Sequence, residues 1–375
     1  MNIQMVDVKS QYLKIKDQID SGIQEVLNNT AFINGPKVKQ FQEEFEAYLD
    51  VKHVIPCANG TDALQIAMMA MGLRPGDEVI VPAFTYVATA EVIALLGLVP
   101  VMVDVDYDTF NISLIGIKNA ITAKTKAIVP VHLFGQSADM ESILKIAEDN
   151  NLFVIEDNAQ AIGSDYMFDD GRKAKAGTLG QIGCTSFYPS KNLGCYGDGG
   201  AIMTNDDKLG VLLHKIANHG QSVRYYHDVV GCNSRLDSIQ AVVLSAKLPH
   251  LDDYCNARIQ VANFYDNAFA EIDQIETPHR AHYTTHVFHQ YTLKVKDGKR
   301  DDLKKYLDDQ KIPSMIYYPV PLYKQEAFKD SSNGLENLEM TELLCKEVIS
   351  LPIHTEMDQE QLKFISEKVM AFFNK

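Results

Sequence analysis

The sequence has little positive charge for its size. Its 375 residues contain 35 Lys and Arg against 50 Asp and Glu, which gives a formal net charge of −15. Binding to nucleic-acid phosphates requires clustered basic side chains, so this charge balance argues against a nucleic-acid partner. An anionic small molecule can still bind through a few local cationic groups.

Long apolar runs are also missing. No stretch of the sequence approaches the roughly 20 apolar residues that span a bilayer, so we expect no membrane partner. Residues 1–7 lack the basic segment followed by an apolar stretch that marks a secretory signal. We therefore expect a cytoplasmic protein.

Cysteine is sparse and scattered. The six cysteines, at positions 57, 184, 195, 232, 255 and 345, do not show the paired spacing of a metal site. In a reducing compartment such residues are usually small buried hydrophobes. We expect structural thiols and no bound metal.

The length of the chain predicts two unequal domains. A sequence of 375 residues with 46% apolar content is longer than the chain that one hydrophobic core typically supports. We expect a large domain over residues 1–250, including an N-terminal segment, and a small C-terminal domain over residues 251–375.

Short apolar runs alternate with helical stretches between residues 51 and 205. The runs are continuously apolar, which is typical of strands buried on both faces of a mostly parallel sheet. We expect a doubly wound α/β core whose ligands bind beyond the carboxyl ends of the strands. The expected strands are 78–82, 99–104, 126–131 and 152–157, and the expected helices are 62–71, 89–96 and 140–149.

The pattern changes after residue 234. Longer helical stretches are mixed with a strand on a small scale, which predicts a compact α+β second domain. Residues 324–339 are polar and read as an exposed loop. The expected helices are 235–247, 254–272, 300–310 and 358–373, and the expected strand is 288–295.

Lys191 is the residue whose setting most suggests chemistry. It follows the apolar run 184–188 and precedes the glycine-rich stretch 194–200. A cationic neighbour or burial lowers the pKa of a lysine and leaves a neutral amine that attacks an aldehyde. A solvated surface lysine is the ordinary alternative for this residue type. The flanking sequence favours an amine that makes Schiff bases.

Asp157 and the segment 59–61 suggest a partner for that amine. A carboxylate at the end of a buried strand is costly unless a cation faces it, and a protonated pyridine nitrogen is such a cation. Gly60 and Thr61 precede an apolar helix, where free backbone amides bind anions. Ordinary capping turns remain the alternative for both positions.

Six ordered motifs together resemble the DegT/DnrJ/EryC1/StrS family of sugar aminotransferases, which use pyridoxal 5′-phosphate (PLP). The resemblance runs from about Val6 to the final helix. It implies fold type I of the PLP-dependent transferases, the aspartate aminotransferase fold. The motifs are CANGTDAL (57–64), PAFTYVAT (82–89), EDNAQ (156–160), SFYPSKNLG (186–194), GDGGA (197–201) and NSRLD (233–237).

The resemblance also implies roles for single residues. Lys191 attaches the cofactor and later moves protons, and Asp157 pairs with the pyridine nitrogen. One implied contact comes from the neighbouring subunit, so a homodimer with shared sites is implied as well. By the same resemblance, Gly60, Thr61 and Ser186 form the phosphate cradle, and Gln160 lies near the oxygen on the cofactor ring. Tyr86 stacks on the ring, and Asn233 reaches the phosphate from the partner subunit.

Arg235, Tyr317 and Tyr318 are the expected substrate contacts. The planar fork of an arginine pairs with two carboxylate oxygens, although a surface ion pair is the alternative. Residues 317–323 read YYPVPLY where the family has HYPxPLH beside the sugar, so Tyr317 and Tyr323 replace histidines. A tyrosine stays neutral where a histidine can carry charge near pH 7.

Among the enzymes of this family, the motifs are most similar to 3-aminotransferases that act on UDP-2-acetamido-2-deoxy-3-oxo-glucuronate. This similarity implies L-glutamate as amino donor and a product used in surface polysaccharide such as lipopolysaccharide O-antigen. A dTDP-3-keto-6-deoxyhexose or a UDP-4-keto sugar is the alternative acceptor. A sugar 3-dehydratase carries histidine in place of Lys191, which argues against that activity. A PLP-binding regulator without turnover is the alternative from another class.

Overall fold

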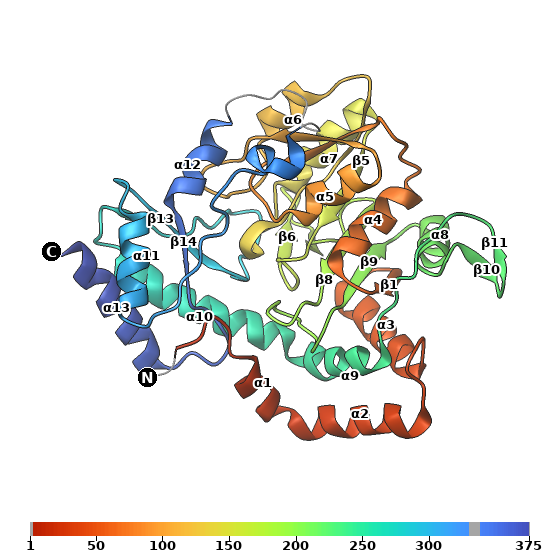
Figure 1. Cartoon of the computed structure of the whole chain (residues 1–375), viewed down its shortest axis with the longest axis horizontal. Coiled ribbons are helices and arrows are strands. Elements are labelled where there is room, and N and C mark those ends of the chain that lie inside the picture. Colours follow the sequence, from red (N-terminus) through yellow and green to blue (C-terminus); the bar gives the residue numbers. More distant parts are fainter. Residues whose placement is uncertain (1–2, 330–337, 375) are drawn as a thin grey trace.

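A seven-stranded sheet forms the centre of the computed structural model, which describes residues 3–329 and 338–374 (Figure 1). Strand β9 runs antiparallel to both of its neighbours, and the other neighbouring pairs are parallel. The predicted mostly parallel sheet is confirmed. In spatial order the strands are β1 (His53–Cys57), β9 (Gly200–Thr204), β8 (Ile182–Ser186), β5 (Phe153–Asp157), β4 (Thr125–Ile128), β2 (Glu78–Pro82) and β3 (Val99–Val103).

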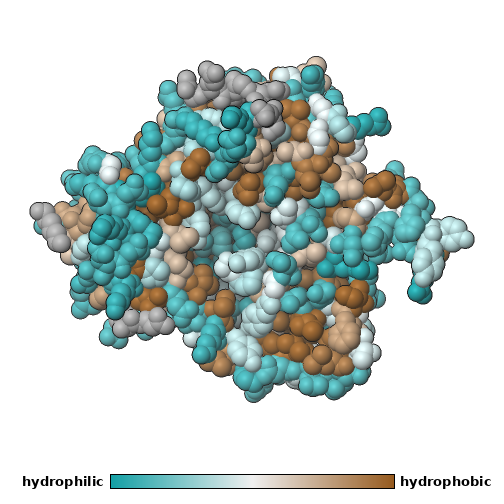
Figure 2. Space-filling view, in the orientation of Figure 1, coloured by the Kyte–Doolittle hydropathy of each residue, from teal (hydrophilic) through white to brown (hydrophobic). Residues whose placement is uncertain are grey.

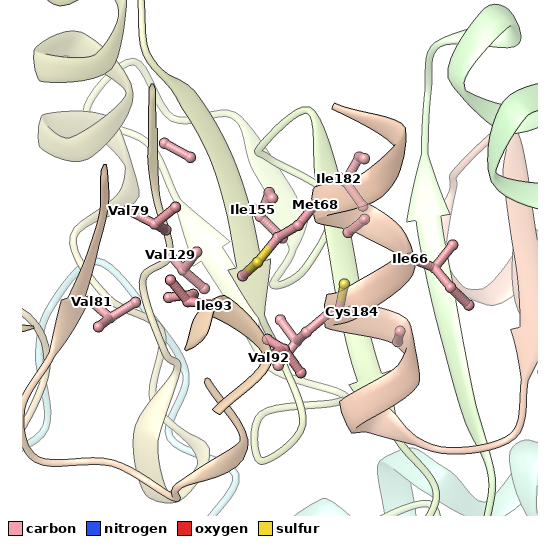
Figure 3. Close-up of a cluster of buried hydrophobic side chains, with 14 of the residues drawn as sticks. Ile66, Met68, Val79, Val81, Val92, Ile93, Val129, Ile155, Ile182 and Cys184 are labelled. Atoms are coloured by element: carbon pink, nitrogen blue, oxygen red, sulfur yellow. The ribbon is translucent and has the colours of Figure 1, made fainter. Parts of the chain in front are cut away.

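Helices pack on this sheet through a cluster of buried apolar side chains. In Figure 3, Met68 of the helix α4 lies against Ile155 of β5, within a cluster that the neighbouring strands complete. The predicted strand 126–131 ends at Ile128, because Pro130 has no amide hydrogen to donate to a neighbouring strand. The helices of this region are α4 (Gly60–Ala70), α5 (Ala88–Leu95), α6 (Leu114–Ala120), α7 (Met140–Asn150) and α8 (Asp207–Ala217).

The N-terminal helices pack beside helix α9 (Ser238–Lys247). Phe41 and Phe45 of the third helix lie edge-on to Phe187, which joins that helix to the loop after β8. The helix expected over 235–247 begins at Ser238, since the preceding Asp237 pairs with Ile33 as an isolated bridge. The N-terminal helices are α1 (Val8–Lys14), α2 (Lys16–Asn29) and α3 (Pro36–Leu49).

A second, antiparallel sheet lies near both chain termini (Figure 1) and has its own apolar core. The predicted strand 288–295 begins at Tyr291, because Phe288 has a φ of 46° and its carbonyl accepts a hydrogen bond from Arg258. The division at residues 250 and 251 stays a prediction. The strands are β12 (Ile275–Glu276), β13 (Tyr291–Val295) and β14 (Val348–Leu351), with helices α10 (Leu251–Phe269), α11 (Arg300–Asp309), α12 (Glu339–Glu347) and α13 (Gln359–Phe373).

Two small hairpins stand apart from the sheets. The pair β10 (Gln221–Val223) and β11 (Tyr226–His227) projects from the body, as Figures 1 and 2 show. The other pair is β6 (Asp165–Met167) and β7 (Lys173–Lys175). Part of the loop expected over 324–339 forms the short 3₁₀ turn Glu326–Phe328, and its residues 330–337 lie outside the described ranges. Among the described helices, none is both long and apolar enough to cross a membrane.

Candidate functional site

The loops that carry the predicted site residues leave the same edge of the central sheet. Gly60 follows β1, Tyr86 follows β2, Asp157 ends β5 and Lys191 follows β8. These four strands run in the same direction, so their carboxyl ends meet at one edge, where open α/β sheets bind ligands. Figure 2 shows a face of the molecule that is hollowed near its centre.

Lys191 lies in the loop after β8 and is partly buried. Its backbone amide donates to the Tyr188 carbonyl at 2.8 Å, which fixes the turn that presents the side chain. Burial lowers the pKa of the Lys191 amine to about 8, and the negative charge of Asp157 opposes this shift. A larger neutral fraction near pH 7 suits an amine that must attack an aldehyde.

Asp157 is held by two hydrogen bonds at the end of β5. The Thr89 hydroxyl donates to its Oδ2 at 2.7 Å, and the Ala159 amide donates to its Oδ1 at 3.1 Å. The Asp157 residue is only 6% exposed, so its carboxylate is shielded from bulk water. Thr89 is fully buried in the first turn of α5, and the sequence interpretation gave it no role although it ends the motif 82–89.

We expect Thr89→Val to weaken cofactor binding and turnover by about tenfold or more, because a hydrogen bond to a buried carboxylate contributes about 1.5–3 kcal/mol. The variant keeps the shape of the side chain. Cofactor affinity and kcat are the quantities to measure. Thr85→Val is the matched control, since the Thr85 hydroxyl is buried without a partner among the described residues. Equal effects of both changes would contradict the role given to Thr89.

Gly60 brings the start of α4 against Ser186. A Cβ atom at residue 60 would lie 2.8 Å from the Ser186 Cβ, which is closer than real side chains approach. Asn59 caps the helix by accepting from the Asp62 amide at 2.8 Å. The amides of the first helical turn have no partner within the helix, so the start of α4 suits an anion. The phosphate cradle of Gly60, Thr61 and Ser186 stays a prediction.

Gln160 joins two other predicted residues. Its Oε1 accepts from the Phe134 amide at 2.8 Å, and its Nε2 donates to the Tyr318 hydroxyl at 3.2 Å. The Tyr86 ring lies 6.4 Å from the Tyr318 ring, and the Tyr86 residue is 57% exposed. Tyr86 therefore has a ring face free for stacking.

The two tyrosines that replace family histidines have different surroundings. The Tyr323 hydroxyl donates to Glu342 Oε1 of α12 at 2.5 Å, so it is already bonded within the chain. Tyr317 is partly buried, and its ring lies 6.0 Å from that of Tyr318. Tyr317 is therefore the better placed of the two to meet a substrate.

Asn233 and Arg235 are not brought to Lys191 by any described contact within the chain. Asn233 is exposed and pairs with Asn218 as an isolated bridge. Arg235 is partly buried, and its Nε finds no hydrogen-bond partner among the described residues. An arginine with an unused donor can bind a carboxylate supplied from outside the chain.

Two buried residues near the site were given no role in the sequence interpretation, although Glu156 begins the motif 156–160. Glu156 accepts from His132 Nε2 at 2.8 Å and from three backbone amides of residues 177–180 at 2.6–2.8 Å. This network attaches the end of β5 to the loop over residues 177–180. His289 lies near Lys191, and burial holds its pKa well below the usual range, with Lys191 as the next cause.

The groups gathered at this edge fit a phosphorylated pyridine aldehyde. A lysine of lowered pKa suits the aldehyde, a shielded carboxylate suits the ring nitrogen, and the helix start suits the phosphate. Together with the mostly parallel sheet, they define a PLP-dependent transferase of fold type I.

The chain belongs to the DegT/DnrJ/EryC1/StrS aminotransferase family, whose profile matches residues 13–370. It is thus a PLP-dependent aminotransferase. The resemblance drawn from the six motifs, the fold class and the cofactor are all confirmed.

Relatives cover nearly the whole chain. The "Pleiotropic regulatory protein" of Geobacillus stearothermophilus is 45% identical over 375 residues, which are 100% of this chain and 99% of that protein. The UDP-2-acetamido-2-deoxy-3-oxo-D-glucuronate aminotransferase of Pseudomonas aeruginosa is 44% identical over 363 residues, or 97% and 98% of the two chains. The solved structure of S. venezuelae DesV in complex with a ketimine intermediate matches with a TM-score of 0.95 at 35% identity, covering 100% of this chain and 99% of that one.

Proposed function

We propose that this aminotransferase moves an amino group from L-glutamate to C3 of UDP-2-acetamido-2-deoxy-3-oxo-glucuronate. The observation that carries this proposal is the 44% identity to an aminotransferase named for that sugar nucleotide. Arg235 supports it, because its unused Nε donor suits the carboxylate that distinguishes a uronate from other sugars. The product is an amino sugar for surface polysaccharide.

Lys191 is the proposed proton carrier of both half-reactions. Its Nζ takes the proton from the α-carbon of glutamate in the first and returns a proton to C3 of the sugar in the second. When bound, PLP supplies an electron sink for the carbanion formed next to the nitrogen. The lowered pKa of about 8 lets the Lys191 amine both accept and give a proton near neutral pH.

The other proposed roles follow from the contacts at the strand ends. Asp157, oriented by Thr89, pairs with the pyridine nitrogen. The sugar approaches on the side of Tyr317 and Tyr318, where the Tyr318 hydroxyl is held by Gln160. The same residues serve donor and acceptor in turn, because the two substrates share one site. The proposed cofactor contacts are Gly60, Thr61, Ser186, Gln160, Tyr86 and, from the partner subunit, Asn233.

We also propose a homodimer in which each chain supplies Asn233 and Arg235 to the other's site. Asn233 is exposed, and the segment over residues 223–230 just before it carries exposed apolar side chains, among them Val223, Tyr226 and Val230. A cytoplasmic location is proposed as well. The six cysteines are free thiols, as in a reducing compartment.

Mixing two variants, one inactive and one with little activity on the 3-oxo-glucuronate, tests the shared site with that acceptor. A heterodimer of Lys191→Ala with Arg235→Ala contains one intact site and one site with both defects, so random re-association should restore about a quarter of the wild-type activity. Activity after co-refolding and the mass in solution are the measurements. No recovery from a dimeric mixture would contradict a shared site and place Arg235 beside its own Lys191.

The substrate is tested by comparing two acceptors in the wild type and in Arg235→Leu. We expect the change to lower kcat/KM for the 3-oxo-glucuronate by about 100-fold, since it removes a bidentate charged pair. UDP-2-acetamido-2-deoxy-3-oxo-glucose, which lacks the carboxylate, should lose little. If both acceptors lose equally and KM for glutamate rises, Arg235 binds the donor instead.

The same assay separates the other candidates. Activity of the wild type on a dTDP-3-keto-6-deoxyhexose or a UDP-4-keto sugar, with none on the uronate, would replace the uronate as the proposed substrate.

The relative named as a regulatory protein favours a second candidate, a PLP-binding regulator without turnover. Glutamate added to the holoenzyme distinguishes it, because a regulator would leave the visible absorbance of the bound cofactor unchanged.

A further inference from the structure

Lys247 is a buried lysine outside the catalytic edge of the sheet. It is the last residue of α9 and only 1% exposed. Its Nζ donates to the Gly194 carbonyl at 2.7 Å and lies 4.5 Å from the centre of the Tyr196 ring. The described ion pairs do not give this ammonium a carboxylate partner.

Packing does not explain a lysine at this position. Burying an ammonium without a counter-charge is unfavourable, and an apolar side chain of similar length fills the same space without that cost. Burial lowers the pKa of Lys247 to about 8, which reflects the same cost. The group that Lys247 contacts is therefore the place to look for its role.

That contact belongs to the turn that presents Lys191. A Cβ atom at Gly194 would lie 2.5 Å from the Pro189 carbonyl oxygen and 2.8 Å from that of Tyr188, so the chain doubles back tightly between these residues. The Cys195 amide donates to the Phe187 carbonyl at 2.8 Å and closes the base of the turn. A shift of Gly194 must therefore move Lys191 with it.

Helix α9 holds this turn at a second point. The Tyr196 amide donates to Gln240 Oε1 at 2.8 Å. Lys247 adds a charge-assisted bond to a carbonyl, which is stronger than a bond between neutral groups. The turn is thus attached to helix α9 at two points, Gln240 and Lys247.

We propose that Lys247 is a positioning residue for Lys191, which fixes the Gly194 carbonyl and thereby the turn that aims the Lys191 amine at the cofactor aldehyde. The inference rests on the proposed role of Lys191. It predicts that losing the Lys247 ammonium slows the steps that need Lys191 and leaves folding and phosphate binding in place.

The test uses Lys247→Met, with Lys294→Met as the matched control. Lys294 is equally buried, at 2% side-chain exposure, and its Nζ contacts the Tyr107 carbonyl at 3.2 Å and Glu276 at 2.9 Å. The first readout is covalent capture of PLP by the apo-enzyme, in which the Lys191 amine adds to the aldehyde carbon and water leaves. The second is affinity for pyridoxamine phosphate, which has no aldehyde and needs no lysine. Thermal unfolding of the apo-enzyme is the third.

We expect Lys247→Met to slow capture and kcat by about 10- to 100-fold, because a displacement of about 1 Å costs that much. Pyridoxamine phosphate affinity and Tm should stay near the wild-type values, and Lys294→Met should not slow capture. Normal capture in Lys247→Met, or a loss matched by pyridoxamine phosphate affinity, would overturn the proposal. Lys247→Gln is the second variant should the first not fold, and normal capture there overturns the proposal equally. Capture that persists in Lys191→Ala would instead refute the role of Lys191.

Discussion

Lys191→Ala should abolish transamination, with a loss of about 10⁴-fold or more in kcat, because the role proposed for Lys191 covers both the covalent attachment of PLP and the proton transfers. Turnover of glutamate with a keto sugar nucleotide measures the loss in kcat. Borohydride reduction of the holoenzyme followed by peptide mass analysis measures the loss of covalent attachment. The wild type should gain the mass of the reduced cofactor on the peptide containing Lys191, and the variant should not.

Lys175→Ala is the control for this change, since Lys175 lies outside the predicted site and makes a partly exposed ion pair with Asp165. Capture of PLP by the wild-type apo-enzyme should also depend on pH. The neutral amine is the reactive form and its pKa is about 8, so the rate should rise about tenfold per unit below pH 8 and level off above it. Turnover at normal rate in Lys191→Ala, or a rate that keeps rising to pH 10.5, would refute the assignment.

The strands that carry the site could be read from the sequence because their signal is local. Buried parallel strands are continuous apolar runs, and residues at their ends, such as Asp157, are placed by the run itself. The reversed direction of β9 is not encoded in its apolar composition, since both orientations bury the same side chains. The start of β13 depends on Arg258, which lies 30 residues from Phe288 and takes its carbonyl.

The site residues divide in the same way. Lys191, Gly60 and Ser186 belong to short sequence motifs, so the amino-acid sequence alone identifies them as candidate site residues. Thr89 could not be found this way, because its role depends on a contact with Asp157 across 68 residues. The bond between Tyr323 and Glu342 is a tertiary contact that the motif 317–323 does not contain. Arg235 has an unused donor in one chain, so its role depends on a molecule outside that chain.

Asp157→Asn should lower kcat by about 10³-fold without unfolding the protein. The amide keeps the shape of the side chain and can still accept from Thr89, but it cannot hold a proton on the pyridine nitrogen, so the ring loses its strength as an electron sink. The apo-enzyme should be as stable as the wild type or more so, since the change removes a shielded charge whose proposed counter-ion is the cofactor nitrogen. Steady-state kcat and thermal unfolding of the apo-enzyme are the measurements.

Glu156→Gln at the neighbouring position should give the opposite result. The Glu156 carboxylate is fully buried and accepts from His132 and three backbone amides, so an amide there leaves a donor unpaired and lowers the free energy of unfolding by about 1–3 kcal/mol. Its kcat, measured well below the unfolding temperature, should change little. Of these two adjacent acids, Asp157 would then be needed for turnover and Glu156 for stability. If Asp157→Asn lost stability and kept kcat instead, the pyridine nitrogen would have to pair with another group.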